Sequence, residues 1–205
     1  MSRKLACTRS WPSSIIKFTY APPAEKGCSA CGLAAFRKTF VFGSGNVHAP
    51  LMVVGEAPGA DEDAQGLPFV GAAGAMLTKM LAAIGLDRKN DVFITNVLKC
   101  RPPDNRTPES TEIETCRRIV EAQIGIIKPK AFLLLGRIAA HALLPTRESI
   151  SSLRAQTFFI NGAPAFVTYH PAALLRNEEY KRPAWEDMKK LKQFIVEHRL
   201  YAATD

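Results

Sequence analysis

The chain has 205 residues, of which 47% are apolar and 22% are charged, and its formal net charge is +8. This length fits one compact domain with a sizeable core, and this composition excludes an intrinsically disordered chain. No stretch approaches the roughly 18 uncharged apolar residues of a membrane-spanning helix, so we expect no membrane contact.

Half of the excess positive charge lies in residues 1–24, which contain four basic side chains and no acidic one. We expect this segment to be a basic N-terminal arm rather than an organelle transit peptide, because Pro12 and Pro22-Pro23 interrupt any long amphipathic helix. Residues 25–205 are then expected to form the single folded domain. The positive charge fits either a soluble surface or attraction to a polyanion such as nucleic acid, and charge alone does not distinguish them.

Apolar runs and helical periodicity alternate from residue 51 onward. Strands are predicted at 51–54, 92–94, 131–135, 158–160 and 165–168, the last two joined by the hairpin signal Asn161-Gly162. Helices are predicted at 72–84, from 107–109 to 127, at 137–144 and at 184–198. Buried strands that alternate with helices predict an α/β fold with a parallel sheet covered on both faces.

Four of the five cysteines are spaced as metal ligands often are. Cys28 and Cys31 form a Cys-x2-Cys pair, and fifteen residues separate Cys100 from Cys116. Four thiolates without a nearby histidine fit zinc or a [4Fe–4S] cluster, and spacing alone favours neither. Buried free thiols and a redox-active Cys-x2-Cys pair are the alternatives. Cys7 lies on the arm and is interpreted as a free thiol without an assigned role.

Ligands of parallel sheets bind beyond the carboxyl ends of the strands, so the residues that follow each strand are the candidates for chemistry. The first strand leads into a tight turn, 55–59, that exposes backbone N–H groups but lacks the lysine and spacing of a phosphate loop. Phe69 follows, between Pro68 and a glycine-rich stretch, where its ring can stack on a planar ligand. A phenylalanine of the hydrophobic core is the alternative interpretation.

The other strand ends carry polar groups. Asn96 ends the second strand, and its carboxamide offers the donor and the acceptor that reading a base edge requires. Lys99, Arg101 and Arg106 then form a basic cluster, with an ordinary solvated loop as the alternative. His170 follows the last strand. Together with Phe69, these strand ends predict one pocket for a flat heterocycle.

Three segments resemble the motifs of the bacterial and archaeal family 4 uracil-DNA glycosylases: GEAPGADEDAQGLPFVG, TNVLKCRPPDNRTPE and TYHPAALLRN. Cys28, Cys31, Cys100 and Cys116 resemble that family's four ligands to a [4Fe–4S] cluster, including the gap of fifteen residues. The resemblance covers residues 28–195 and favours iron–sulfur over zinc.

The resemblance implies a single-domain three-layer fold in which a four-stranded parallel sheet lies between helices. Residues 25–205 would then be a uracil-DNA glycosylase domain with a [4Fe–4S] cluster. The implied activity is hydrolysis of the N-glycosidic bond of deoxyuridine in single- and double-stranded DNA, which releases uracil and leaves an abasic site. The implied partner is uracil-containing DNA, and the implied state is a monomer in the bacterial cytoplasm, associated with the nucleoid through DNA.

The resemblance also implies a role for each site residue. His170 would donate to uracil O2, and Glu56, or else Glu62 or Asp63, would position the attacking water. The residues expected to contact uracil are Gly55, Glu56, Ala57, Pro58, Phe69, Asn96 and His170. The residues expected to contact DNA are Leu174, Leu175, Arg176 and Arg101, with Leu174 or Leu175 as a wedge in the base stack.

Two positions depart from the family pattern: Gly32 stands where proline is common, and Ala155 stands where glycine is usual. A related branch bonds covalently to DNA through a histidine in a basic insert, but residues 146–157 contain no histidine, so no permanent cross-link is expected. The alternatives are a related glycosylase for another deaminated base such as hypoxanthine, and a cluster-bearing DNA-binding or redox protein without catalysis.

Overall fold

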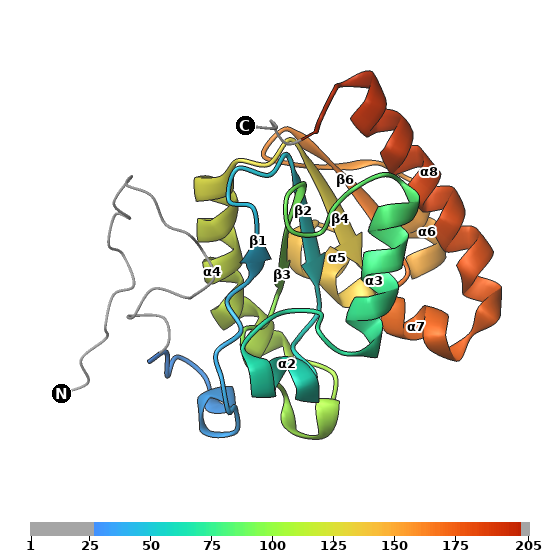
Figure 1. Ribbon diagram of the computed structural model, residues 1–205. Coiled ribbons are helices and arrows are strands. Elements are labelled where there is room, and N and C mark those ends of the chain that lie inside the picture. Colours follow the sequence, from blue (N-terminus) through green and yellow to red (C-terminus); the bar gives the residue numbers. More distant parts are fainter. Residues whose placement is uncertain (1–26, 202–205) are drawn as a thin grey trace.

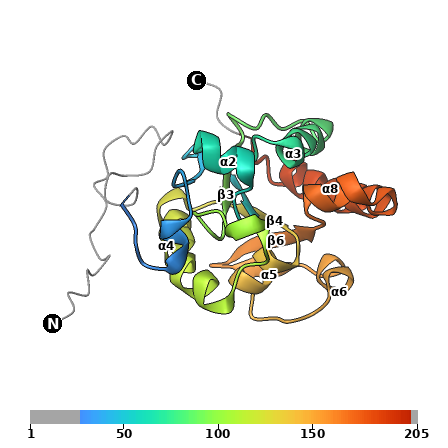
Figure 2. The ribbon, with the colours of Figure 1, turned by 90° about the horizontal axis from the view of Figure 1, so that it is seen from below.

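The computed structural model describes residues 27–201, and the predicted basic arm with Cys7 lies outside them. The described part of the chain forms one six-stranded sheet, in the order β1-β3-β2-β4-β6-β5, with helices on both of its faces (Figures 1 and 2). This arrangement confirms the expected α/β class.

The four inner strands are parallel to one another. They are β3 (Val92–Asn96), β2 (Leu51–Gly55), β4 (Ala131–Leu135) and β6 (Ala163–Thr168). Every residue of β2, β3 and β4 is buried, because helices cover both faces. This burial explains why the three segments are continuous apolar runs rather than alternating patterns.

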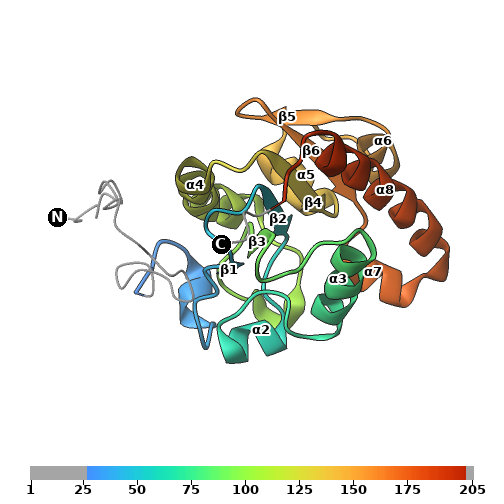
Figure 3. The same ribbon diagram turned by 45° about the horizontal axis from the view of Figure 1, so that its top comes forward.

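Two short antiparallel strands extend the sheet at its opposite edges, β1 (Ser44–Gly45) beside β3 and β5 (Phe158–Ile160) beside β6 (Figure 3). The expected count of four strands is therefore wrong, although the four parallel strands are the predicted ones. β5 belongs to the predicted hairpin, and φ is positive at both Asn161 and Gly162, as a tight hairpin turn requires. β1 has only two residues, which is too few for an alternating pattern to be recognised.

The longer helices are α3 (Ala72–Ala83), α4 (Ser110–Ile127) and α8 (Lys181–Glu197). The shorter ones are α2 (Ala60–Gln65), α5 (Arg137–Leu143), α6 (Ile150–Arg154) and α7 (Pro171–Arg176). Single 3-10 turns are η1 (Gly32–Ala35), η2 (Pro103–Asn105) and η3 (Glu178–Tyr180). Over residues 27–201, no helix has both the length and the apolar character to span a bilayer.

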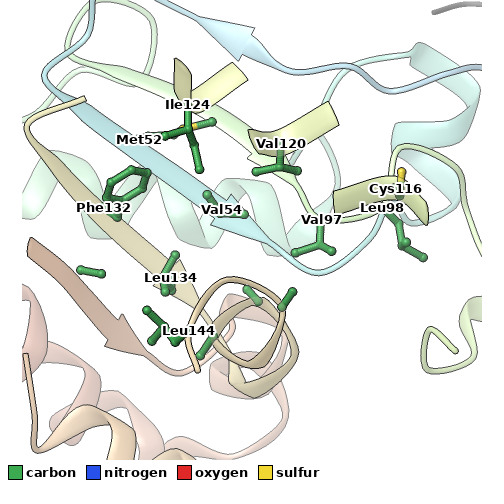
Figure 4. Close-up of a cluster of buried hydrophobic side chains, with 14 of the residues drawn as sticks. Met52, Val54, Val97, Leu98, Cys116, Val120, Ile124, Phe132, Leu134 and Leu144 are labelled. Carbon is green, nitrogen blue, oxygen red and sulfur yellow. The ribbon is translucent and has the colours of Figure 1, made fainter. Parts of the chain in front are cut away.

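The pleat of the strands sends alternate side chains into two separate cores. One core joins the sheet to α4 and α5 and includes Met52, Val54, Val120, Ile124, Phe132 and Leu134 (Figure 4). The other joins the opposite face to α3 and α8 and includes Leu51, Val53, Leu77, Leu81, Leu133 and Leu191. The fold therefore has three layers, in which helices pack on both faces of the sheet.

Candidate active site

The carboxyl ends of β2 and β3 bring two predicted site residues together. Gly55 pairs with Asn96 across these strands. A methyl group at Gly55 would lie 2.3 Å from Asn96 Oδ1 and 2.5 Å from Phe69 Cζ. Only glycine fits at this point, because the carboxamide and the aromatic ring both approach the backbone of Gly55 directly.

Asn96 keeps an unused acceptor in this position. The residue is 1% exposed, and its Oδ1 atom has no hydrogen-bond partner among residues 27–201. A buried polar atom without a partner costs about 1–3 kcal/mol, so such atoms are rare outside functional sites. The oxygen is therefore available to a group that donates a hydrogen bond to it.

Phe69 and His170 form the opposite side of this site. Their ring centroids lie 5.6 Å apart and the rings are tilted by 31°. Phe69 is 4% exposed and has a φ of +54°, in the left-handed region. Phe69 belongs to the core formed with α3 and α8, as the alternative interpretation expects, and its ring also lies beside Gly55 at the end of β2.

His170 is the N-cap residue of α7, and its Nδ1 atom accepts the N–H of Ala172 at 3.2 Å. In the neutral ring the proton therefore resides on Nε2, which is a donor. Burial, followed by the positive charge of Arg176, lowers the pKa of His170 to about 4. The side chain is thus a neutral hydrogen-bond donor near pH 7.

Four carboxylates follow β2, and three of them, Glu56, Glu62 and Asp63, are the candidates for positioning water; these three differ in their surroundings. Burial raises the pKa of Glu56, while the nearby charge of Arg137 lowers it. Glu62 has both oxygens engaged by backbone N–H groups of its own loop. Asp63 is 2% exposed and accepts the N–H groups of Lys38 and Thr39. Glu62 and Asp63 therefore hold backbone segments together, whereas no such contact engages the carboxylate of Glu56 among residues 27–201.

The remaining residues of the β2 turn lie beside this carboxylate. Pro58 is buried, and Glu56 and Ala57 are half-buried. Arg137, which opens α5 at the end of β4, carries no sequence signal because an arginine at a helix start has many ordinary roles. Only the packing of β4 beside β2 brings its charge near Glu56.

The two leucines of α7 differ in exposure. Leu174 is 3% exposed and belongs to the core formed with α3 and α8, whereas Leu175 is 49% exposed. Arg176 is exposed beside it, and Arg101 is half-exposed, with its Nε atom donating to Asn105 at 2.8 Å. Leu175, not Leu174, is placed to contact a partner.

The expected basic cluster is not formed as a unit. Lys99 is fully buried, and its Nζ atom donates to Thr95 Oγ1, to Asn96 O at 2.8 Å and to Gln123 Oε1 at 2.9 Å. Burial lowers the pKa of Lys99 to about 7. Arg106 pairs with Glu112 at 2.6 Å. Sequence spacing could not show this, because one partner of each side chain, Gln123 for Lys99 and Glu112 for Arg106, comes from α4.

The four predicted metal ligands come from three segments. Cys100 and Cys116 are buried in the core beneath α4, and Cys28 and Cys31 pack against it. None of the four is in a disulfide. The backbone N–H of Lys99 points at Cys116 Sγ at 3.3 Å, and Arg37 donates to Cys100 Sγ at 3.2 Å.

The burial of two of these thiols affects how they could hold a metal. Burial raises the pKa of Cys116 to about 12 and also raises that of Cys100, so a bound cation is needed to keep them as thiolates. The described residues contain no group of three or more His, Cys, Asp or Glu side chains arranged to hold a metal ion. A [4Fe–4S] cluster instead takes one thiolate per iron, and donors to the sulfurs tune it. The donor set of four thiols fits such a cluster.

Residues 42–189 match the family model described as the uracil DNA glycosylase superfamily. The chain is 44% identical over 171 residues to the type-4 uracil-DNA glycosylase of Pyrobaculum aerophilum, covering 80% of this chain and 87% of the relative. It is 45% identical over 177 residues to that of Saccharolobus solfataricus, covering 82% of each. It is 42% identical over 174 residues to that of Thermotoga maritima, covering 83% of this chain and 90% of the relative.

Proposed function

This chain belongs to the uracil-DNA glycosylase superfamily, and we propose that it hydrolyses the N-glycosidic bond of deoxyuridine in single- and double-stranded DNA. The products are free uracil and an abasic site. The observation that carries this proposal is the orphaned Oδ1 atom of Asn96 beside the ring of Phe69. The names of the three relatives described above, each a type-4 uracil-DNA glycosylase, support the same substrate.

Asn96 distinguishes uracil from cytosine by its two amide atoms. Its Oδ1 accepts the N3–H of uracil, and its Nδ2 donates to O4. Cytosine has an acceptor at N3 and a donor at its amino group. Two acceptors would then face each other at one contact and two donors at the other, and these buried groups would be left unpaired. Phe69 stacks on the face of the base.

The bond breaks with negative charge developing on uracil and positive charge on the sugar. The neutral His170 donates from Nε2 to uracil O2, where it stabilises the departing anion without transferring its proton. Backbone N–H groups of the 55–59 turn add to this stabilisation. Glu56 positions the water that attacks C1′ and opposes the positive charge of the sugar.

The extruded base leaves a gap that a side chain must fill. Leu175, which is 49% exposed, inserts into the stack, and Arg176 and Arg101 bind neighbouring phosphates. Leu174 supports α7 from within the core and does not contact DNA. Of the two leucines, this assignment makes Leu175 the wedge.

Cys28, Cys31, Cys100 and Cys116 would hold a [4Fe–4S] cluster. When bound, this group supplies a rigid cross-link between the segment before η1, the loop that carries Arg101, and α4. The contacts from Arg37 and the Lys99 backbone to the sulfurs support such a structural role. We propose further that the protein acts as a monomer in the cytoplasm.

The proposal is tested with purified protein on oligonucleotides that carry one uracil, hypoxanthine, thymine or cytosine, each single- and double-stranded. Alkali then cleaves any abasic site, and strand cleavage measures excision. We expect cleavage at uracil in both forms and none at thymine or cytosine. Faster cleavage at hypoxanthine would favour the related glycosylase, and binding without cleavage would favour a non-catalytic DNA-binding protein.

A further inference from the structure

Phe69 has a backbone conformation that phenylalanine seldom adopts. Its φ of +54° lies in the left-handed region, where a side chain crowds the backbone. Residues in such conformations persist only where their surroundings determine them. The contacts of the loop around Phe69 therefore decide where its ring lies.

Arg88, in the turn between α3 and β3, holds the carbonyl groups of this loop. Its Nη1 atom donates to Phe69 O at 2.9 Å, and its Nη2 atom donates to Pro68 O at 3.2 Å. Nη1 also donates to Thr78 Oγ1 at 3.0 Å, and this hydroxyl is tied back to Gly74 O of α3. Because the guanidinium is planar with donors in a fixed fork, it holds two successive carbonyl groups at a set angle.

Glu62 of α2 holds the amide groups that follow. One carboxylate oxygen accepts the N–H of Val70 at 2.9 Å and of Gly71 at 3.0 Å. The other oxygen accepts the N–H of Gly59 at 3.0 Å, which ties the loop to the turn after β2. Burial lowers the pKa of the half-buried Arg88, and the negative charges of Asp87 and Glu62 oppose this lowering. The loop thus lies between two opposite charges.

Helix α3 closes the remaining side. A Cβ atom at Gly74 would lie 1.8 Å from Phe69 O. The first turn of α3 therefore packs directly on the Phe69 peptide, and this peptide has no space in which to rotate toward a more common conformation.

We propose that Arg88 and Glu62 are positioning residues for uracil excision: they hold Phe69 so that its ring is in place before the base arrives. The inference rests on the proposed function. Neither residue needs to touch the base, and Arg88 lies outside the three motifs. A ring held in advance stacks on the extruded base without a cost of ordering, and it keeps the base against Asn96 and His170.

The test is a double-mutant cycle with Arg88→Ala and Phe69→Ala, measured by single-turnover excision of uracil. Lys89→Ala is the matched control, because Lys89 is an exposed basic residue of the same turn. We expect Arg88→Ala to lower the rate about 10- to 100-fold, since small misplacements of a contact have effects of this size. In the Phe69→Ala background the same change should lower the rate by less than about twofold. Arg88→Lys should recover part of the rate, and Lys89→Ala should keep all of it.

A second readout does not depend on catalysis. Amide hydrogen exchange at Val70 and Gly71 should become faster in Arg88→Ala and in Glu62→Gln, and it should be unchanged in Lys89→Ala. Equal effects of Arg88→Ala with and without the Phe69 ring, or unchanged exchange, would overturn the inference. If Arg88→Ala does not fold, both single-turnover excision and amide hydrogen exchange are measured on Arg88→Lys and Glu62→Gln instead. A wild-type protein that releases no uracil would refute the proposed function, while the exchange experiment would still decide whether the loop is held as described.

Discussion

The rings of Phe69 and His170 lie 5.6 Å apart between their centroids, although one residue follows β2 and the other follows β6. The two strands are not neighbours, since β4 lies between them in the sheet. The loop around Phe69 must therefore cross the strand ends, held by Arg88 and Glu62, to meet the histidine. The faces that we propose to contact uracil are thus already adjacent in the free protein.

Asn96→Asp should separate base recognition from folding. It replaces the amide donor with a second acceptor, so uracil excision should lose about 2–4 kcal/mol of transition-state stabilisation, and cytosine should become relatively better tolerated. Single-turnover excision on both bases measures this. Asn161→Asp, the same change in an exposed turn, should leave excision unchanged. Normal uracil excision by a folded Asn96→Asp protein would remove Asn96 from the site.

His170→Asn should slow the chemical step and spare binding. Asparagine can still cap α7 through its side-chain oxygen, but it does not place a donor where His170 Nε2 lies. Loss of one donor to a developing charge typically costs 10²–10³ in rate. Equilibrium binding of uracil-containing DNA should change little, because the base carries no full charge before the bond breaks. An equal loss of binding and rate would show that the role is not specific to the transition state.

The same histidine should make the protein sensitive to acid. Its pKa is lowered to about 4 in the folded state, against about 6.5 in the unfolded chain, so between these values the unfolded chain binds more protons. The free energy of unfolding should therefore fall as the pH drops from about 7 to about 4, by up to about 3 kcal/mol from this residue. Protonation at Nδ1 also removes the acceptor that caps α7. Denaturant unfolding of wild type and His170→Asn across this range should show a smaller slope in the variant.

Leu174→Ala should lower folding stability, whereas Leu175→Ala should slow excision from duplex DNA. Leu174 is buried, so its truncation should cost about 2–5 kcal/mol of folding stability and affect both DNA forms alike. Leu175→Ala should leave the unfolding midpoint unchanged and slow excision from duplex more than from single strands, because only the duplex must be held open. Thermal unfolding and excision on both substrates test the pair. If Leu175→Ala were equally active on both forms, the wedge would lie elsewhere.

The four cysteines should hold iron rather than zinc. Protein purified without oxygen should be brown, with iron and sulfide near four each per chain, as the stoichiometry of the cluster requires. Cys100→Ser should lower the iron content and the solubility more than it changes the preference for uracil. Metal analysis measures this directly, and zinc as the bound metal would contradict it.

The sequence by itself determined the central sheet and the place of the site. The runs 51–54 and 131–135 are apolar without interruption, which is the pattern of strands buried on both faces. Because parallel strands end at one edge, the order of the chain was enough to predict that Asn96 and His170 would gather there with the Phe69 loop.

Only the tertiary structure decided which way individual side chains face. Lys99 was grouped with Arg101 by position, yet it bonds to Gln123 of α4 inside the core. Leu174 and Leu175 are adjacent and identical, and the packing of α7 on α3 buries one and exposes the other. The packing that buries Lys99 and Leu174 includes helices far away in the chain, α4 and α3. A contact between distant segments leaves no local pattern in the sequence, so the tertiary structure was needed to show which of these side chains are buried.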